Sequence, residues 1–213
     1  MQTNLKNLKI LNLYGGLGGN RKYWTNCIVT MVEKNEQIAN VYRKLYPDDI
    51  VIIGDAMEYL KLHYKEFDFV ACSPPCQSNS KMVKATRHDV AGYADLSLYQ
   101  IVIFLTHFFK GKWYVENVDP YYNALIKPTA TIGRHLFWSN FVITPFKEPT
   151  IKGFITKDTV AETQELKDWL GIQYEGNIYY NGNHSPGQVL RNCIHPLIGE
   201  HLLKCALNKT ELF

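Results

Sequence analysis

Short apolar runs and longer amphipathic stretches alternate through the first half of the chain. Apolar runs bounded by turn residues are typical of strands buried in a sheet, whereas apolar spacings of three and four residues are typical of helices. Strands are predicted at Lys9–Leu13, Cys27–Val32, Ile50–Ile53, Phe67–Cys72 and Lys112–Val115. Helices are predicted at Asn35–Tyr46, Met57–Tyr64 and Leu96–Phe109. This alternation predicts an α/β fold in which a mostly parallel sheet carries helices on both faces.

The second half of the chain has a less regular pattern. A further strand is predicted at Leu136–Ile143, and helices at Thr159–Leu170 and Asn192–Leu207. The polar stretch Gln77–Asp95 has no period, which predicts a mobile loop, and Pro145–Thr156 and Asn177–Gly187 are expected to be irregular. The 213 residues fit one domain of roughly 100–200 residues and hardly two. We therefore expect a single domain.

The composition is that of an ordinary globular protein, with 46% hydrophobic and 20% charged residues. The net charge of +3 permits a nucleic-acid partner without arguing for one, because a local basic surface matters more than the total. No apolar run approaches the roughly 20 residues that span a bilayer, and Met1–Lys9 lacks the apolar core of a secretory signal. The five cysteines have no disulfide-framework spacing. We expect a cytoplasmic protein with reduced thiols and no membrane partner.

Candidate nucleoside-binding groups follow three successive predicted strands. The first strand leads into the glycine-rich turn Gly15–Gly19, where backbone N–H groups can approach a ligand closely. Glu33 ends the second, where a carboxylate can accept from both ribose hydroxyls, and Asp55 follows the third, where it can accept from an adenine amino group. Because the carboxyl ends of parallel strands share one edge of a sheet, these groups favour an adenosine-containing cofactor. The turn lacks the spacing of a dinucleotide fingerprint, which favours S-adenosylmethionine over NAD.

Cys76 is the candidate nucleophile. It follows Pro74-Pro75 at the end of the fourth predicted strand, on the same edge as the cofactor groups. Prolines restrict the backbone and hold the thiol in one direction, and an ionised cysteine is a strong nucleophile. Glu116 follows the predicted strand Lys112–Val115 on this edge. A carboxylic acid there can donate to cytosine N3 and so activate carbon 6 for attack by a thiolate.

Together these elements resemble the DNA (cytosine-5)-methyltransferase family. Leu11–Gly19 resembles its first motif, with Asn12 in place of the usual aspartate. Pro74–Gln77 resembles its nucleophile motif, Glu116–Val118 its glutamate motif and Leu190–Ile194 its final motif. The resemblance implies a Rossmann-like methyltransferase fold that uses S-adenosylmethionine as cofactor, releases S-adenosylhomocysteine and needs no metal.

One motif of the family is altered in this chain. Gly133-Arg134-His135 stands where the family has a Gln-x-Arg-x-Arg element, whose arginine contacts the cytosine O2. Two registers are open. In one, Arg134 takes this role; in the other, His135 aligns there and Arg134 serves another purpose.

The resemblance also assigns roles to individual residues. Tyr14 is expected to pack near the methionine moiety of the cofactor, and Ser80 to contact a phosphate. The expected catalytic residues are Cys76, Glu116 and Arg134. The expected cofactor-binding residues are Tyr14, Gly16, Leu17, Gly18, Gly19, Glu33, Asp55, Pro74, Asn192 and Cys193. The expected substrate-binding residues are Pro75, Gln77, Ser80, Asn117 and Val118.

The implied reaction is methylation of carbon 5 of a cytosine flipped out of DNA, as in restriction–modification systems. The whole chain, residues 1–213, would form the catalytic domain, with a short recognition-like insertion at about residues 142–188. The family's usual recognition domain is larger, so a partner that supplies specificity is also compatible with the sequence. Two alternatives stay open: a cytosine-5 methyltransferase of RNA such as tRNA, and a non-catalytic cofactor-binding or regulatory subunit. The presence of Cys76 and Glu116 argues against the second.

Overall fold

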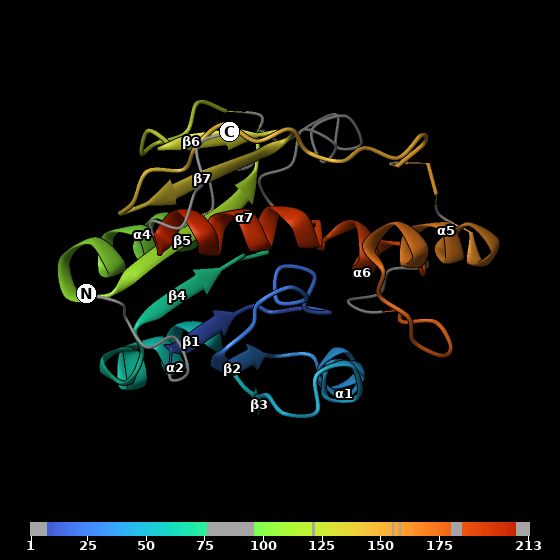
Figure 1. Cartoon of the computed structure of the whole chain (residues 1–213), viewed down its shortest axis with the longest axis horizontal. Helices are drawn as coiled ribbons and strands as arrows, with labels where there is room; N and C mark the ends of the chain where they lie inside the picture. Colours follow the sequence, from blue (N-terminus) through green and yellow to red (C-terminus); the bar gives the residue numbers. More distant parts are fainter. Residues whose placement is uncertain are drawn as a thin grey trace.

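The computed structural model describes residues 8–75, 96–120, 122–154, 156–157, 159–179 and 185–207. The described residues form a seven-stranded sheet in the order β3-β2-β1-β4-β5-β7-β6 (Figure 1). The strands are β1 (Leu8–Leu13), β2 (Cys27–Glu33), β3 (Ile50–Ile53), β4 (Phe69–Cys72), β5 (Lys112–Val118), β6 (Ala130–Ile132) and β7 (His135–Ser139). Strands β1 to β5 pair in parallel, and β7 runs antiparallel to both β5 and β6. The predicted α/β fold with a mostly parallel sheet is confirmed.

Helices cover both faces of this sheet. They are α1 (Glu36–Leu45), α2 (Ala56–His63), α4 (Ser97–Phe108), α5 (Val160–Leu170), α6 (Gln188–Arg191) and α7 (Pro196–Ala206), and a short 3-10 turn (Tyr64–Glu66) follows α2. In Figure 1, α7 crosses the near face of the sheet, while α2 and α4 lie behind it. Among the described helices, none is both long and apolar enough to cross a membrane.

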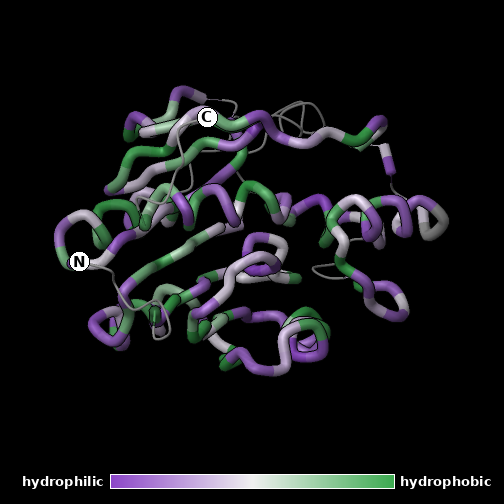
Figure 2. Tube along the Cα trace, viewed as in Figure 1, coloured by the Kyte–Doolittle hydropathy of each residue, from purple (hydrophilic) through white to green (hydrophobic). Residues whose placement is uncertain are grey.

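The alternation of side chains along the strands builds one core on each face. Leu11 and Leu13 of β1 point to the face that α2 and α4 cover, where they join Leu60 and Leu105. Ile10 points to the opposite face and packs with Phe69, Tyr114 and residues of α7. Figure 2 shows apolar positions gathered along the central strands, as expected for a sheet buried on both faces.

A third apolar cluster lies beyond the carboxyl ends of the parallel strands. There α5 and α6 pack on Leu17 of the glycine turn and Ile38 of α1, through Leu166, Leu170 and Leu190 among others. The Lys22 ammonium also donates to the Gly171 carbonyl at the end of α5. The α5 segment, which lies between the two stretches expected to serve recognition, is therefore packed directly onto the glycine turn.

The structure corrects the prediction at three ends of elements. Strand β5 continues through Glu116 and ends at Val118 rather than Val115. Strand β7 ends at Ser139 rather than Ile143, because the Asn140 side chain bonds the Trp113 N–H (3.0 Å) and the Gly111 carbonyl (2.9 Å). The last helix begins at Pro196 rather than Asn192. Proline has no N–H and disfavours helical backbone in the residue before it, so His195 caps α7 and the short α6 stands apart.

Strand β6 was not predicted. It is three residues long and joins β7 through the turn at Gly133-Arg134, in which Gly133 has a φ of 56°. Glycine at the first central position of a two-residue hairpin turn supplies this positive φ without strain. The hairpin places Arg134 at its tip and His135 at the first position of β7.

Candidate active site

A cavity of about 380 Å³ opens at the carboxyl ends of the central strands. Its walls come from the glycine turn, the end of β2 with the start of α1, the end of β4, the end of β5, the β6–β7 turn, and α6 with the α6–α7 connection. The expected site residues that line it are Tyr14, Gly16, Gly19, Glu33, Pro74, Pro75, Glu116, Asn117, Val118, Arg134, Asn192 and Cys193. Residues far apart in the sequence are thus brought together as predicted.

The glycine turn is held in one conformation by close packing. Tyr14, Gly16 and Gly18 have φ values of 54°, 54° and 73°. A Cβ on Gly18 would lie 2.5 Å from the Tyr46 ring, whereas one on Gly16 would meet nothing within 4 Å. Gly18 is therefore needed for packing behind the turn, and Gly16 leaves the backbone bare on the cavity side.

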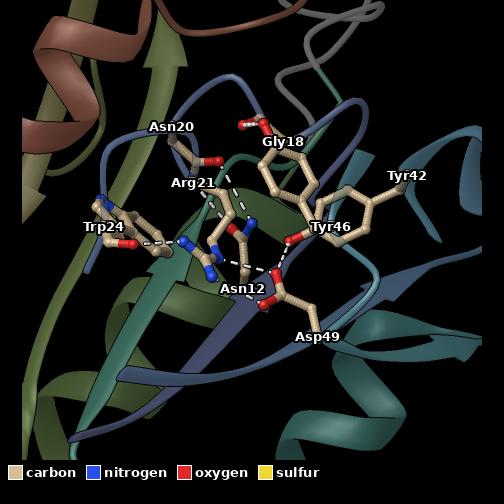
Figure 3. Close-up of polar contacts among 8 residues, drawn as sticks. All are labelled: Asn12, Gly18, Asn20, Arg21, Trp24, Tyr42, Tyr46 and Asp49. Carbon is tan, nitrogen blue, oxygen red and sulfur yellow. Dashed lines mark hydrogen bonds and ion pairs between the residues drawn. The ribbon is translucent and has the colours of Figure 1, made fainter. Parts of the chain in front are cut away.

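A polar cluster anchors the turn from behind (Figure 3). The Arg21 guanidinium donates to both oxygens of Asp49, at 2.8 and 2.9 Å, and to the Trp24 carbonyl at 2.6 Å. The Tyr42 hydroxyl donates to Asp49 (2.8 Å), and the Tyr46 hydroxyl donates to the Gly18 carbonyl (2.8 Å). A bidentate, part-buried pair of this kind fixes geometry as well as charge. The cluster therefore ties the turn to α1 and to the chain that follows it.

Glu33 faces the cavity from the end of β2. Its Oε2 accepts from the Gly16 N–H at 3.3 Å, and its Oε1 accepts from the Asn35 N–H at 2.9 Å. Burial raises the pKa of this carboxyl group, and the N–H groups of Asn35, Gly16 and Lys34 partly offset that effect. The carboxylate is thus held rigidly beside the bare backbone of Gly16, as a group that receives hydroxyl donors would be.

The α6–α7 connection closes the cavity opposite β1. A Cβ on Gly19 would lie 2.3 Å from the Ile194 carbonyl oxygen, so the glycine turn and this connection are in tight contact. Burial raises the pKa of the Cys193 thiol to about 12, although the Leu17 and Gly19 N–H groups lower it, so this cysteine stays neutral. The Asn192 side chain accepts from Gln188 Nε2 at 2.7 Å and lies in the cavity wall.

Three expected cofactor residues lie outside the cavity lining. Leu17 is fully buried under α5, and Gly18 faces the two tyrosines of α1 and its cap. The Asp55 Oδ1 accepts from the N–H groups of Met57 (2.9 Å) and Glu58 (3.0 Å) and so caps α2. Its assignment to an adenine amino group stays a prediction, and capping is the role the structure displays.

The nucleophile and glutamate motifs are joined by a hydrogen bond. The Asn117 Nδ2 donates to the Pro74 carbonyl at 3.0 Å, and Asn117 is almost fully buried. Because β4 and β5 are adjacent and parallel, with Cys72 opposite Val115, this bond fixes the chain leaving β4 against the end of β5. Pro75 and Val118 line the cavity on either side of this bond. Cys76, Gln77 and Ser80 lie outside the described residues.

Glu116 is paired with His135. The Glu116 Oε1 lies 2.5 Å from the His135 Nδ1, and both side chains are buried. Arg134 lies at the cavity wall with its guanidinium directed elsewhere: its Nη2 donates to the Arg191 carbonyl at 2.7 Å, and the group stacks on Phe154 at 4.7 Å. Of the two registers left open by the sequence, His135 is the one that meets Glu116. The role assigned to Arg134 stays a prediction.

Several cavity residues were not predicted from the sequence. Asn20, Asn35, Ile38, Ser73 and Arg191 all belong to the wall. Asn20 immediately follows the first motif and Ser73 immediately precedes the nucleophile motif, so their position in the chain was the available signal. Ile38 and Arg191 come from helices, where only the packing of α1 and α6 decides which side chain reaches the cavity.

The protein has a Rossmann-like methyltransferase fold. This fold is defined by the order of the strands in the sheet, by the antiparallel strand β7 and by a cavity at the carboxyl ends of the parallel strands. The structure aligns with the Entamoeba histolytica methyltransferase EhMeth at a TM-score of 0.56 and 12% identity, over 97% of this chain and 99% of that chain. A family model described as C-5 cytosine-specific DNA methylase matches residues 8–120, more than half of the chain. The protein therefore belongs to the C-5 cytosine-specific DNA methylase family, which confirms the resemblance found in its motifs.

Two further solved structures are similar over part of the chain. A mutant of Spodoptera frugiperda DNMT2 aligns with 23% identity over 55% of this chain and 38% of its own, with a TM-score of 0.43. A putative DNA modification methyltransferase encoded within an Escherichia coli prophage aligns with 20% identity over 53% of this chain and 32% of its own, with a TM-score of 0.37. The matched region thus spans well under half the length of these two enzymes. No curated protein sequence matches the chain.

Proposed function

We propose that this protein methylates carbon 5 of cytosine in DNA with S-adenosylmethionine as the methyl donor. One observation carries the proposal. A single cavity is lined by Glu33 and the bare backbone of Gly16 on one side, and by Pro75 and Glu116 on the other. Its volume of about 380 Å³ lies within the roughly 300–1,000 Å³ of small-molecule sites. Cofactor and base would therefore meet in one space.

The cofactor side of the cavity fits an adenosine-containing ligand. The Glu33 carboxylate is held by two N–H groups, which leaves its remaining lone pairs for ribose hydroxyls. Ile38 supplies an apolar wall beside it, and Gly16 allows close approach of the ligand to the backbone. The cofactor supplies an electrophilic methyl group on a sulfonium. Glu33, Gly16 and Asn192 would hold it in place.

The base side of the cavity fits a flipped cytosine, since carbons 5 and 6 are not accessible to this chemistry within a stacked duplex. The Cys76 thiolate would add to carbon 6 while Glu116 gives a proton to N3, which leaves carbon 5 nucleophilic. Carbon 5 takes the methyl group and then loses its proton to solvent. The bond between the Cys76 sulfur and carbon 6 breaks, N3 returns its proton to Glu116, and the ring becomes aromatic again.

Nucleic-acid binding would come from charges around the cavity mouth. Among the described residues, Lys147 and Lys152 are exposed on the chain that follows β7. Lys157 is paired with Glu165 and contributes less free charge. Lys81, Lys84 and Arg87, which we also expect to contact phosphates, lie outside the described residues. Affinity built on phosphate contacts would fall steeply as salt rises.

The decisive experiment measures transfer of labelled methyl groups to duplex DNA, single-stranded DNA and tRNA in parallel. Transfer to duplex DNA, with 5-methylcytosine as the product, is the expected result. If tRNA is methylated in preference to DNA, the substrate class is RNA, and the proposed chemistry is unchanged. In DNA that carries 5-fluorocytosine, the wild type should form a covalent adduct, because fluorine cannot leave as a proton does. Mass spectrometry that finds the adduct on a residue other than Cys76, or finds no adduct, would contradict the mechanism. Cys76→Ser should abolish turnover and keep cofactor binding.

A further inference from the structure

His135 and Glu116 are diagonal neighbours on two antiparallel strands. His135 lies opposite Val118 in the β5–β7 ladder, and Glu116 lies two residues before Val118, so the two side chains project from the same face of the sheet. Their nitrogen and oxygen are 2.5 Å apart, and the exposed fractions of the side chains are 4% and 7%. At this distance, the two buried side chains are joined by a short hydrogen bond.

A second carboxylate faces the other side of the His135 ring. The Glu148 Oε1 lies 3.7 Å from the His135 Nε2, and the Glu148 side chain is 16% exposed. Gly133 makes room for it, because a Cβ at that position would lie 1.6 Å from the Glu148 Oε2. The imidazole therefore stands between a carboxylate in the cavity wall and one closer to solvent.

Among the described residues, His135 is the group near Glu116 that can exchange a proton with it, because the other ionisable groups close to the site are neutral or engaged elsewhere. Burial, and then the Glu116 carboxylate, raise the pKa of the Cys72 thiol in β4. Burial is also the main cause that raises the pKa of Tyr114 on β5, with a smaller effect of Glu116. Both groups therefore remain neutral. The Arg134 guanidinium is engaged by the Arg191 carbonyl and the Phe154 ring.

We propose that His135 is a positioning residue that orients Glu116 and supplies it with a proton, and that Glu148 holds the His135 ring from its Nε2 side. The proposal rests on the proposed function. Before attack, the His135 Nδ1–H donates to the Glu116 Oε1, so that Oε2 carries the acid proton toward cytosine N3. As the sulfur–carbon 6 bond forms, that proton moves to N3 and the Nδ1 proton moves to Oε1. When the bond breaks, both protons return, and the Nε2 proton faces Glu148 throughout.

Three variants separate positioning from proton supply. His135→Asn keeps an N–H donor near the place of Nδ1 but cannot release its proton. His135→Phe removes both functions, and Glu148→Gln removes the second charge at nearly constant shape. His107→Asn, at an exposed position of α4, is the matched control. The readouts are kcat against pH on the best nucleic-acid substrate and the dissociation constant of the cofactor.

We expect His135→Asn to lower kcat and to change its dependence on pH, because the amide keeps a hydrogen bond to Glu116 but cannot release a proton. Glu148→Gln should change the same dependence, because it removes the charge that faces the His135 Nε2. His135→Phe should lower kcat by roughly 100-fold or more at every pH, with cofactor affinity unchanged, since the residue lies on the base side. Identical pH profiles for wild type and His135→Asn would overturn the proposal.

Nitrogen NMR of the full-length protein labelled at histidine gives a readout that needs no activity. The Nδ1 of His135 should carry a proton that is hydrogen-bonded to Glu116, and Glu148→Gln should shift the Nε2 resonance, because it removes the carboxylate charge that faces this nitrogen. A bare Nδ1 in the wild type would overturn the proposal. If no nucleic acid is methylated, the proposed function fails and these spectra still decide the role of His135.

Discussion

Asn12 and Asn20 form a reciprocal amide pair across the glycine turn. The Asn20 Nδ2 donates to the Asn12 Oδ1 at 2.9 Å, and the Asn12 Nδ2 donates to the Asn20 Oδ1 at 3.3 Å. The Asn20 amide also donates to the Tyr114 hydroxyl at 3.1 Å, which links the turn to β5 (Figure 3 shows the two asparagines). Both asparagines are buried, so the pair closes the turn in a region from which water is excluded. The amide at position 12, where the family has aspartate, is therefore matched to its partner.

Asn12→Asp should destabilise the protein. Whichever way the Asn20 amide is turned, one oxygen of the aspartate would face the Asn20 oxygen, and a buried acceptor would lose its donor. Such a loss costs about 1–3 kcal/mol, and more when the group is charged. Urea denaturation measures the change in the free energy of unfolding. Asn40→Asp, at an exposed position of α1, is the control and should change it little. Equal stability of the two variants would show that the amide pair is unimportant.

Gly19→Ala should impair the cavity, whereas Gly54→Ala should not. The added methyl at Gly19 would lie 2.3 Å from the Ile194 carbonyl oxygen and 3.0 Å from the Cys193 Cβ, so the α6–α7 connection would have to move. Overpacking of this kind costs about 1–3 kcal/mol. At Gly54 the methyl meets nothing within 4 Å. Calorimetric binding of S-adenosylmethionine should weaken for the first variant only. Unchanged affinity in Gly19→Ala would place the cofactor elsewhere.

Glu33→Gln should weaken cofactor binding. Loss of a charged hydrogen bond costs about 1.5–3 kcal/mol, which is roughly ten- to a hundredfold in the dissociation constant. Glu58→Gln, at an exposed position of α2, should leave it unchanged. If Glu33→Gln binds the cofactor as tightly as the wild type, the pocket assignment is wrong.

The same residue gives cofactor binding a pH dependence. Burial raises the pKa of Glu33 above its ordinary value of 4.5. In the proposed function, the ionised form is the one that would accept from ribose hydroxyls. As pH falls, affinity should therefore decline at a pH above 4.5 in the wild type. Titration calorimetry over a pH series measures this decline. It should be weaker in Glu33→Gln, which has no carboxyl group to protonate, and an equal decline in both proteins would assign the effect to another residue.

Acidification should destabilise the protein through His195. The His195 Nδ1 accepts from the Leu197 N–H at 3.2 Å and caps α7, which requires the unprotonated nitrogen. Burial lowers the pKa of His195 from 6.5, against a smaller opposing effect of a hydrogen bond to the Trp169 backbone. Below pH 6.5 the unfolded chain then binds more protons than the folded one, so the free energy of unfolding falls as pH drops.

Melting temperatures at about pH 7.5 and about pH 5.5 test this, because histidine changes charge in that interval. His195→Asn keeps a capping side chain that does not titrate, so its melting temperature should drop less than that of the wild type. His107→Asn should behave like the wild type. The same drop in all three proteins would exclude His195 as the source.

The parts of the fold that were predicted are those with continuous apolar runs. Ile50–Ile53 was predicted with its observed bounds, because a short β-branched run between turn residues has few alternatives. Ala130–Ile132 was missed because it is too short to show a period, and only its pairing with β7 makes it a strand. The break between α6 and α7 was readable from Pro196, whose effect on the preceding residue is local.

The site was predictable where a role depends on position at a strand end. Glu33 ends β2 and Glu116 lies two residues before the end of β5, and both line the cavity as expected. The contact of Glu116 with His135 was not predictable, because it depends on the register of β5 against β7. Asp55 shows the opposite case, since an aspartate just before a helix is also a good N-cap, and the sequence does not distinguish the two roles.

The closure of the cavity joins the first and last described segments of the chain. Gly19 packs on Ile194, and the Trp24 Nε1 donates to the Gly199 carbonyl at 3.0 Å across 175 residues of sequence. Contacts between residues so far apart in the sequence form slowly, because the entropy of a long loop must be lost before the contacts can stabilise the fold. During synthesis, the sheet can assemble from β1 to β5 before α7 has emerged. The growing chain would then contain the parallel strands, the glycine turn and the carboxylates of Glu33 and Glu116. It would still lack the α6–α7 connection, which forms one wall of the proposed cofactor site.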